Sequence, residues 1–469
     1  MGGVRAYVRS TFQSLQIRNY RLFATGQLIS LIFGWVQITA QDWLVLELSH
    51  GSPSALGVVT ALQFAPMLLV TLYAGKLADR FDKRLLLLAV NTLWLVLAAL
   101  MGGLVVSGRV QLWQVYVFAA LWGTVSAVES PVRQAFVSEL VGKALLPNAL
   151  SLNAATFNTA RIAGPALAGV TIAVWGTGTA FVVNAVSYVF PLLVIARMRP
   201  AELHRALSRI PAADARIIDG LRYVRRRPDL LLPLVLIMVI ATVGFNFQLT
   251  LPVLAKNEFH TGAATFGLLV TALAVGALVG ALAGTRRRAR PSAWLVLGAA
   301  VAFGVLSTVA GLMPTYPLTA LVLVPTGFAQ VFLGQAANQR VQLGTDPELR
   351  GRVMALFILA FLGTNPVAAP LVGWFAQAFG PRASIWAGGA ISLTAALAAL
   401  GWQLRGSGAR LRLRLIPVPR ISVDVVPVWQ GEPHGVPTLA ELPGRRLHPV
   451  TPGRPRPERP GAELSRVDG

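Results

Sequence analysis

The stretch Leu85–Val106, LLLLAVNTLWLVLAALMGGLVV, contains no charged side chain. A helix rises about 1.5 Å per residue, so this stretch is long enough to cross the ~30 Å hydrocarbon core of a bilayer. Inside lipid every backbone N–H and C=O group needs a partner within the protein, and a helix supplies those partners. The stretch therefore predicts a transmembrane α-helix.

The rest of the chain has the same character. Hydrophobic residues make up 55% of the sequence and charged residues only 13%, with a mean hydropathy of +0.62. A soluble protein normally carries about 25% charged residues. We therefore expect an all-α membrane protein with twelve transmembrane helices, bounded by charged or Gly/Pro-rich clusters. The expected spans are residues 22–46, 54–75, 85–107, 112–130, 152–174, 178–196, 230–254, 263–284, 292–313, 317–337, 353–377 and 383–404.

Basic residues lie mostly on one side of these spans. If the N-terminus is cytosolic, the loops on the opposite side hold only Arg109, Lys256 and Arg382. The positive-inside rule predicts such a bias for a correctly oriented protein. It also explains the net charge of +22 without nucleic acid, because cytosolic loops face anionic lipid. We expect a multi-pass protein of a bacterial cytoplasmic membrane with both termini in the cytosol.

Several other classes are disfavoured. The chain has no cysteine, which excludes disulfides, and its five histidines lack the spacing of metal ligands. The first apolar span is about 25 residues long, whereas the apolar region of a cleaved signal peptide has about 7–15. No Walker A motif is present, because the Gly-Lys pairs at residues 75–76 and 142–143 are not followed by Ser or Thr. We expect no nucleotide, no metal, no cofactor and no enzymatic activity.

Two segments interrupt the apolar pattern. The linker at residues 197–229 separates a first bundle, residues 1–196, from a second bundle, residues 230–404. Residues 212–227 form either an amphipathic helix on the membrane surface or a solvated connector that caps the seventh span. The tail, residues 405–469, holds 11 of the 30 prolines and is expected to be cytosolic and disordered.

An internal repeat relates the two bundles. Residues 75–84 match residues 280–288, and Pro165 and Pro370 lie in a second pair of matching segments at the same offset of 205 residues. Both matches relate corresponding spans of the two six-helix bundles. They predict a duplicated six-helix unit, which is the architecture of transporters that rock two halves about a central site.

The first of these segments also carries a family resemblance. Gly75-x-Leu77-Ala-Asp79-Arg80-x-x-Lys83-Arg84 resembles the signature of the major facilitator superfamily between its second and third spans. That signature usually has glycine at the position of Asp82, so the turn could differ here. Further stretches resemble the bacterial exporters similar to the enterobactin exporter, and together they cover about residues 15–404. They are residues 18–23, 130–140, 146–149, 160–165 and 347–353.

The resemblance implies a fold of two pseudo-symmetric six-helix bundles, alternating access and efflux driven by proton exchange. It also implies a cytoplasmic latch, because charges between the second and third spans can contact helix ends in only one global state. The repeat has Gly284 at the position of Asp79, so the latch is expected in the first half alone. The latch residues are Gly75, Leu77, Asp79, Arg80, Lys83 and Arg84.

Four charges are candidates for coupling or for the cavity. Arg161 lies within the fifth span and is expected to face the cavity or a partner acid, because a charge facing lipid is costly. Glu129 either carries a proton or forms a gate ion pair with Arg133. Asp42 is either a proton carrier or an interfacial acid at the outer end of the first span.

Two further groups complete the candidate site. Gly164, Pro165 and Gly169 are expected to bend the fifth span, because proline frees a backbone carbonyl. Polar residues inside spans line the cavity or bond between helices. These candidates are Asn158, Asn246, Gln248 and Asn365.

The function expected from these features is proton-coupled efflux of an amphipathic small molecule, such as a drug, a siderophore or another natural product. The apolar spans favour such a cargo over a sugar. Two alternatives remain: a nutrient importer or facilitator of the same fold, and a non-transporting scaffold that acts through the tail. The partners expected are a small-molecule substrate and the lipid bilayer, and the chain is expected to be a monomer.

Overall fold

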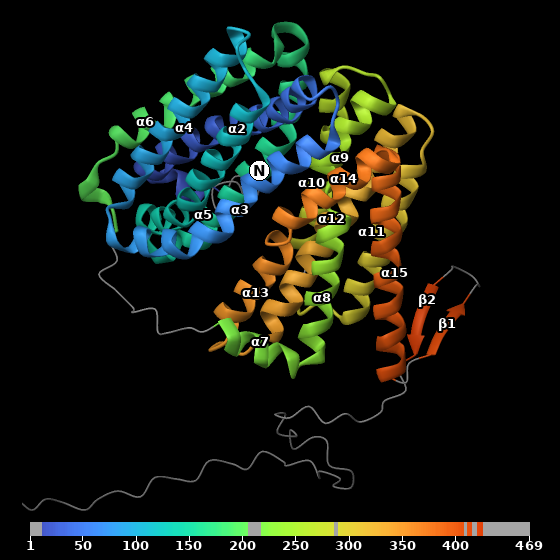
Figure 1. The fold of residues 1–469 in the computed structure, drawn as a ribbon. Helices are drawn as coiled ribbons and strands as arrows, with labels where there is room; N and C mark the ends of the chain where they lie inside the picture. Colours follow the sequence, from blue (N-terminus) through green and yellow to red (C-terminus); the bar gives the residue numbers. More distant parts are fainter. Residues whose placement is uncertain (1–11, 205–216, 286–288, 408–409, 415–419, 425–469) are drawn as a thin grey trace, which may run out of the picture. The chain divides into compact units, whose positions relative to one another are not determined.

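A computed structural model describes residues 12–204, 217–285, 289–407, 410–414 and 420–424; at residues 71–76, 78, 79, 143, 217, 285, 406, 407, 410–414 and 420–424 it describes the backbone only. The described part is helical apart from one hairpin (Figure 1). In chain order the elements are η1 (Gln13–Gln16), α2 (Arg18–Leu48), α3 (Pro53–Arg80), α4 (Lys83–Val106), α5 (Leu112–Ser187), α6 (Val189–Ala196), η2 (Pro200–Glu202), α7 (Ile217–Arg225), α8 (Pro228–Val243), α9 (Phe247–Val253), η3 (Leu254–Glu258), α10 (Ala263–Thr285), α11 (Ala293–Leu312), α12 (Tyr316–Gly344), α13 (Arg350–Leu362), α14 (Asn365–Phe379), α15 (Pro381–Ser407), β1 (Arg410–Arg414) and β2 (Arg420–Asp424).

Eleven helices of the described part are long and apolar enough to cross a membrane. One of them, Ala144–Ala196, has 53 residues and at about 1.5 Å per residue exceeds two bilayer crossings. Its backbone leaves the helical region at Gly176, where φ is +81°. Counted as two spans, this helix gives the expected twelve.

The long α5 shows where the expected boundaries were wrong. The fourth span does not end at residue 130 but continues through Pro131 to Gly142, where φ is +67°. Proline is tolerated within membrane helices because neighbouring groups satisfy the carbonyl that it frees. A positive φ favours glycine, and Gly142 and Gly176 are the two places where α5 turns.

The first six spans and the last six meet along two close helix crossings. A Cβ atom placed on Gly57 of α3 would lie 2.6 Å from the Ala369 carbonyl oxygen of α14. A Cβ atom on Gly267 of α10 would lie 2.5 Å from the Pro165 carbonyl oxygen and 3.1 Å from the Gly169 Cα atom of α5. Small residues permit this close approach, which is the usual means of helix association in membranes.

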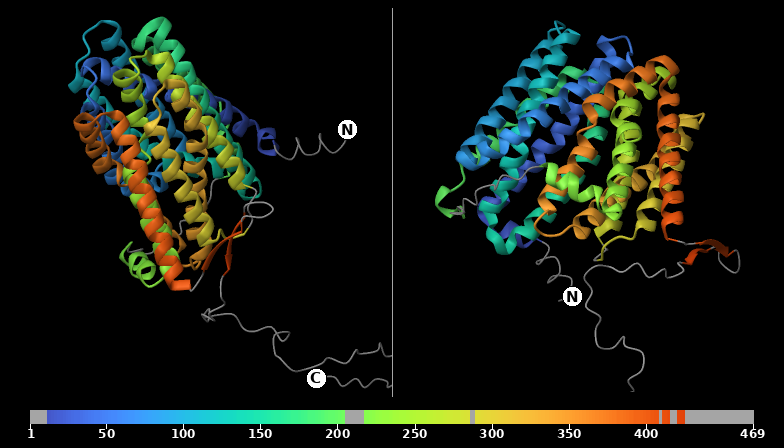
Figure 2. Two further views of the ribbon diagram at one scale, coloured as in Figure 1. Left: turned by 90° about the vertical axis from the view of Figure 1, so that its right-hand side faces the viewer. Right: turned by 60° about the horizontal axis from the view of Figure 1, so that its bottom comes forward.

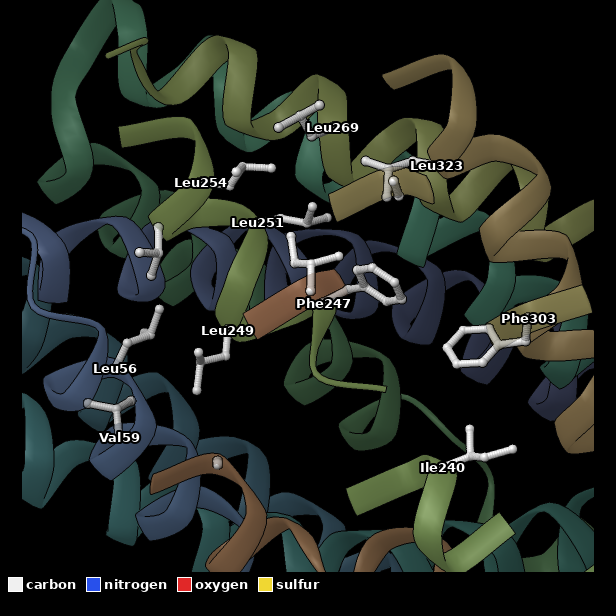
Figure 3. Packing of buried hydrophobic residues seen from close by; sticks show 14 of the residues in the cluster. Leu56, Val59, Ile240, Phe247, Leu249, Leu251, Leu254, Leu269, Phe303 and Leu323 are labelled. Carbon is white, nitrogen blue, oxygen red and sulfur yellow. The ribbon is translucent and has the colours of Figure 1, made fainter. Parts of the chain in front are cut away.

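Further contacts join the halves at one end of the bundle, which we call the closed end. There the Asn257 side-chain amide donates to the Gly51 carbonyl over 2.8 Å, and the Ser52 hydroxyl donates to the Gln377 side chain over 2.9 Å. The Trp43 ring stacks on Phe266 with centroids 6.0 Å apart. Apolar packing continues inward, where Leu249 of α9 lies beside Leu56 and Val59 of α3 (Figure 3).

At the opposite end, the open end, the ion pairs of the described residues join groups of the same half. Lys83 pairs with Glu139 in the first half, and Arg290 and Arg352 pair with Asp229 and Asp219 in the second. Figure 2 shows the spans of the two halves from two further sides. Among the described residues, the halves are therefore held together at the closed end, and no ion pair joins them at the open end.

The linker and the tail both contain ordered elements. In the linker α7 forms within the predicted amphipathic segment and packs on α13, with Val224 buried at 2% exposure. The expectation of a disordered tail is wrong where α15 extends to Ser407 and where β1 pairs antiparallel with β2. The alternation of arginine and leucine in β1 has the two-residue period of a strand. The other tail residues lie outside the described ranges.

Candidate functional site

Three neighbouring hollows lie among the spans. The central hollow has a volume of about 170 Å³ and is lined by α2 and α5 of the first half and by α9, α10, α12 and the turn before α9 of the second. The open-end hollow, about 560 Å³, shares Arg161, Phe245 and Gln330 with it. The first-half hollow, about 320 Å³, shares Trp35 and Gln248 with the central hollow. Their shared walls form one polar and aromatic path between the halves.

Asp42 lies in the wall of the central hollow. Its side chain comes from α2, is only 3% exposed and accepts a hydrogen bond from the side chain of Gln248. It has no ion pair among the described residues. This placement disagrees with the reading of Asp42 as an interfacial acid, because the residue borders an internal hollow. A buried carboxylate without a cationic partner can exchange a proton with whatever fills that hollow.

Arg161 borders both the central and the open-end hollow. Like Asp42, it forms no ion pair in the described part of the chain, and unlike Asp42 it has no hydrogen bond to another described side chain. The expectation that it faces the cavity agrees with this position, and the alternative, a partner acid, finds no support among those residues. The guanidinium is available to acceptor groups of a ligand.

The segment expected to bend the fifth span has a packing role. Backbone angles stay helical from Gly164 to Gly169, and α5 departs from helix only at Gly142 and Gly176. A Cβ atom on Gly164 would lie 2.3 Å from Trp35 Cβ, so this glycine permits contact with α2. Pro165 and Gly169 permit the crossing with α10. The helix therefore continues through Pro165 without a break in its backbone angles, and the bend expected there stays a prediction.

The open-end hollow is lined by a row of amide side chains on α12 and by aromatic rings of α13. This row was missed at the sequence level. Its members recur every one to five residues along an otherwise apolar span, a signal that could have revealed them. They are Gln330, Gln335, Asn338, Gln339 and Gln342, opposite Phe357 and Phe361.

Glu129 and Arg133 lie in the wall of the first-half hollow. They form an ion pair of 2.6 Å one helical turn apart, and Glu129 is 7% exposed. Glu129 does not close the fourth span, as expected, but lies within it, because α5 continues to Gly142. The same hollow has aromatic walls from Trp94 and Trp122, whose rings stack at 6.3 Å.

Of the four polar candidates, only Gln248 lines these hollows. Asn158 donates to the Ala154 carbonyl within α5, and Asn246, in the turn after α8, donates to the Thr242 carbonyl at the end of α8, each over 2.8 Å. Asn365 begins α14. For these three asparagines the cavity interpretation is not supported by the three hollows.

The expected latch fastens parts of the first half to one another. Lys83 pairs with Glu139 at 2.7 Å, while the Arg84 guanidinium donates to the carbonyls of Ile195 and Ala196 at 2.9 and 3.0 Å. Asp82 caps the N-terminus of α4 by accepting from the Arg84 N–H over 2.8 Å. An N-cap requires no positive φ, which explains why this position can differ from glycine.

The remaining latch residues contribute less or fall outside the description. Arg80 is exposed and Leu77 is half-buried at the end of α3. At Gly75 and Asp79 the structure describes the backbone only, so the contacts expected of Asp79 lie outside the description.

The second half has a charge network that the repeat did not predict. Asp229 accepts from Arg290 over 2.7 Å and from Arg227 over 3.0 Å. The hydrogen bond that Arg227 donates to Asp229 raises the pKa of the Arg227 guanidinium, which also donates to the Tyr223 hydroxyl over 3.2 Å. The second half therefore has a charge network of its own, while the expectation of a latch in the first half alone stays a prediction. Different residues fasten the second half, so a comparison at the fixed offset could not find them.

No cluster of acidic or histidine side chains suited to a metal ion occurs among residues that the structure describes. The described site consists of Asp42 and Arg161, the ion pair of Glu129 with Arg133, and a set of amide side chains and aromatic rings. Such a set binds and releases molecules by hydrogen bonding and apolar contact.

Comparison with known proteins gives a consistent match. A sequence model of the family described as transmembrane secretion effector matches residues 9–427. The staphyloferrin A transporter of Staphylococcus aureus is 29% identical over 269 residues, which cover 56% of this chain and 66% of that relative. The multidrug efflux pump Tap of Mycobacterium tuberculosis is 27% identical over 383 residues, covering 78% and 88%. The enterobactin exporter EntS of Citrobacter koseri is 26% identical, covering 72% and 81%.

Solved structures share the fold at low identity. A bacterial homologue of the iron transporter ferroportin in an inward-facing state matches with a TM-score of 0.65 at 16% identity, covering 82% of this chain and 98% of that one. A bacterial homologue of the lysosomal transporter Spinster, also inward-facing, matches with a TM-score of 0.63 at 13% identity, covering 83% and 96%.

Proposed function

The chain belongs to the transmembrane secretion effector family of the major facilitator superfamily, and from this premise we propose that it exports an amphipathic small molecule in exchange for protons. The observation that carries the proposal is the joined set of hollows between two halves packed together at one end only. A cavity that opens to one side at a time is what alternating access requires.

The open end faces the cytosol in this proposal. The loops at the closed end hold few basic residues, and the positive-inside rule then places that end outside. Cargo enters the open-end hollow from the cytosol and passes the amide row of α12. It contacts Asp42 and Arg161, after which the halves rock to open the closed end.

Coupling places one physical demand on the site. If protons flow inward while cargo leaves, cargo and proton must compete for the same group, so that each displaces the other. Asp42 meets this demand, because it lies in the wall of the central hollow and has no cation to hold it. A cargo that donates hydrogen bonds or carries positive charge at this point competes with a proton. Apolar surface of the cargo then packs on Phe245, Phe247 and Phe266.

Purified protein in liposomes tests this proposal. An imposed pH gradient should drive transport of a fluorescent amphipathic dye, and Asp42→Asn should abolish the gradient-driven component while leaving dye exchange at equal pH intact. Glu47→Gln is the matched control, because Glu47 lies on the same helix, is exposed and accepts from the Trp43 indole over 2.8 Å. Gradient-driven transport by Asp42→Asn at the normal rate would contradict the assignment. Uptake of nutrients only, without movement of any amphipathic compound, would favour the importer.

A further inference from the structure

The linker helix α7 presents an exposed face that is both apolar and basic. Ile218 is 61% exposed and Leu221 is 46% exposed, although α7 is not one of the membrane spans. At about 100° per residue, Leu221, Arg225, Ile218 and Arg222 fall within an arc of roughly 100°. Two large apolar side chains and two arginines therefore share one exposed side of the helix.

The opposite side of α7 is anchored to the second half. Val224 is buried, and a Cβ atom on Gly220 would lie 3.0 Å from Arg352 Cβ of α13. The Tyr223 hydroxyl donates to the Asp346 carboxylate over 3.0 Å. These contacts fix the rotation of α7 about its axis, so the apolar and basic face points away from the protein.

The charge of this region is positive and largely unpaired. Arg222, Arg225 and Arg226 are exposed, as is Arg350 at the start of α13, and none has an ion-pair partner in the described ranges. Nearby acids are mostly engaged: Asp219 pairs with Arg352 at 3.8 Å, and Asp229 is held by Arg227 and Arg290. Glu348 is the exposed acid that remains in the turn before α13.

The position of α7 indicates what covers this face. The helix ends at Arg225, and the next membrane span begins at Pro228, so α7 lies at the level where the chain enters the bilayer. We propose that α7 binds anionic phospholipid at the open end, with Ile218 and Leu221 inserted between headgroups and the arginines on the lipid phosphates. This is the composition of an amphipathic helix lying in the membrane interface. The proposal does not depend on the cargo or on proton coupling.

The absence of cysteine makes a direct test possible. Ile218→Cys in the full chain gives a single thiol for an environment-sensitive fluorophore. The labelled protein is placed in nanodiscs of phosphatidylcholine alone or mixed with phosphatidylglycerol. The proposal predicts blue-shifted emission and quenching by brominated lipid in the discs that contain phosphatidylglycerol. A label at Glu202→Cys, exposed elsewhere in the linker, should remain in water in both.

Charge variants separate lipid binding from other occupants. The triple variant Arg222→Gln/Arg225→Gln/Arg226→Gln should remove the effect of phosphatidylglycerol at position 218. The matched variant Arg21→Gln/Arg197→Gln/Arg405→Gln loses the same charge from other exposed sites and should retain the effect. Equal melting temperatures of the two variants would show that folding is unchanged. Water-like emission in both kinds of disc, or quenching that the first triple variant does not reduce, would overturn the proposal. Concentration-dependent emission without lipid quenching would instead indicate a second copy of the chain.

Discussion

At the scale of single residues, Arg161 is the charge whose position most constrains the cavity. It stands where the central and open-end hollows join and has no acidic partner among described side chains. An unpaired guanidinium within a membrane protein is costly unless water or ligand solvates it, so its retention points to contact with cargo.

We therefore expect Arg161→Gln to lower the transport rate of an amphipathic dye at least tenfold, with Arg161→Lys intermediate because it keeps the charge but not the planar fork. Initial rates in liposomes measure this effect. Arg109→Gln, which removes an exposed arginine beyond the third span, should transport normally. Equal rates for Arg161→Gln and the unmodified protein would remove Arg161 from the cargo path.

A methyl group at Gly57 should weaken the contact between the two halves. In Gly57→Ala the new methyl group would lie 2.6 Å from the Ala369 carbonyl oxygen and 3.1 Å from Pro370 Cα, so α3 and α14 must separate. Overpacking of this kind costs about 1–3 kcal/mol. The melting temperature in detergent should fall. Gly103→Ala, where no atom lies within 4 Å of the added carbon, should melt at or above the normal temperature.

At the scale of elements, the turn between the fifth and sixth spans requires glycine at residue 176 because of its backbone angles and not because of close packing. Gly176 has φ +81° and ψ 169°, a region that is essentially restricted to glycine, and no atom lies near its missing Cβ. Gly176→Ala should therefore destabilise the protein by about 1–3 kcal/mol without any clash. Gly401→Ala, in a helix and equally open, should not. Chemical unfolding in mixed micelles compares the two, and matching stabilities would contradict the strain argument.

The ion pair of Lys83 with Glu139 should stabilise the packing of α4 on α5. Lys83→Glu and Glu139→Lys should each weaken the first half, and the double variant should recover stability, because the pair at 2.7 Å is 20% and 12% exposed. A double-mutant cycle should give a coupling of about 1 kcal/mol or more. The same cycle on Arg199 and Glu202, at 65% and 41% exposure, should give a value near zero. Equal coupling in both cycles would show that the latch pair is no more than a surface contact.

The sequence predicted the membrane spans well but not all of their ends or the contacts between them. Hydropathy located the spans because length and apolarity alone decide whether a helix can cross lipid. It misplaced the end of the fourth span because Pro131 resembles a helix stop, whereas the backbone keeps helical angles through Pro131 as far as Gly142. The amide row on α12 was missed because isolated polar residues were weighed one at a time. Of the two arginines that pair with Asp229, Arg227 is two residues away but Arg290 is 61 residues away, and no local pattern reports the second contact.

At the scale of the whole molecule, the two halves behave as bodies that share one contact region. The glycine crossings and the Asn257 and Gln377 hydrogen bonds tie them at the closed end. At the other end each half carries its own network, centred on Lys83 in the first and Asp229 in the second. In the proposed cycle, a motion that separates the closed end and brings the open ends together changes the side of the membrane from which Asp42 and Arg161 are accessible.

Alternating access by the two halves is tested most directly by measuring the distance between the halves at the open end and at the closed end. Because the chain lacks cysteine, spin labels at Arg80→Cys and Arg350→Cys report the open end, and labels at Arg109→Cys and His260→Cys report the closed end. Electron-spin distance measurements in nanodiscs should resolve two populations whose weights change in opposite directions as pH is lowered. Asp42→Asn should shift both pairs to the low-pH distribution at every pH. Distances that stay fixed at both ends, or that lengthen at both ends together, would contradict alternating access by these two halves.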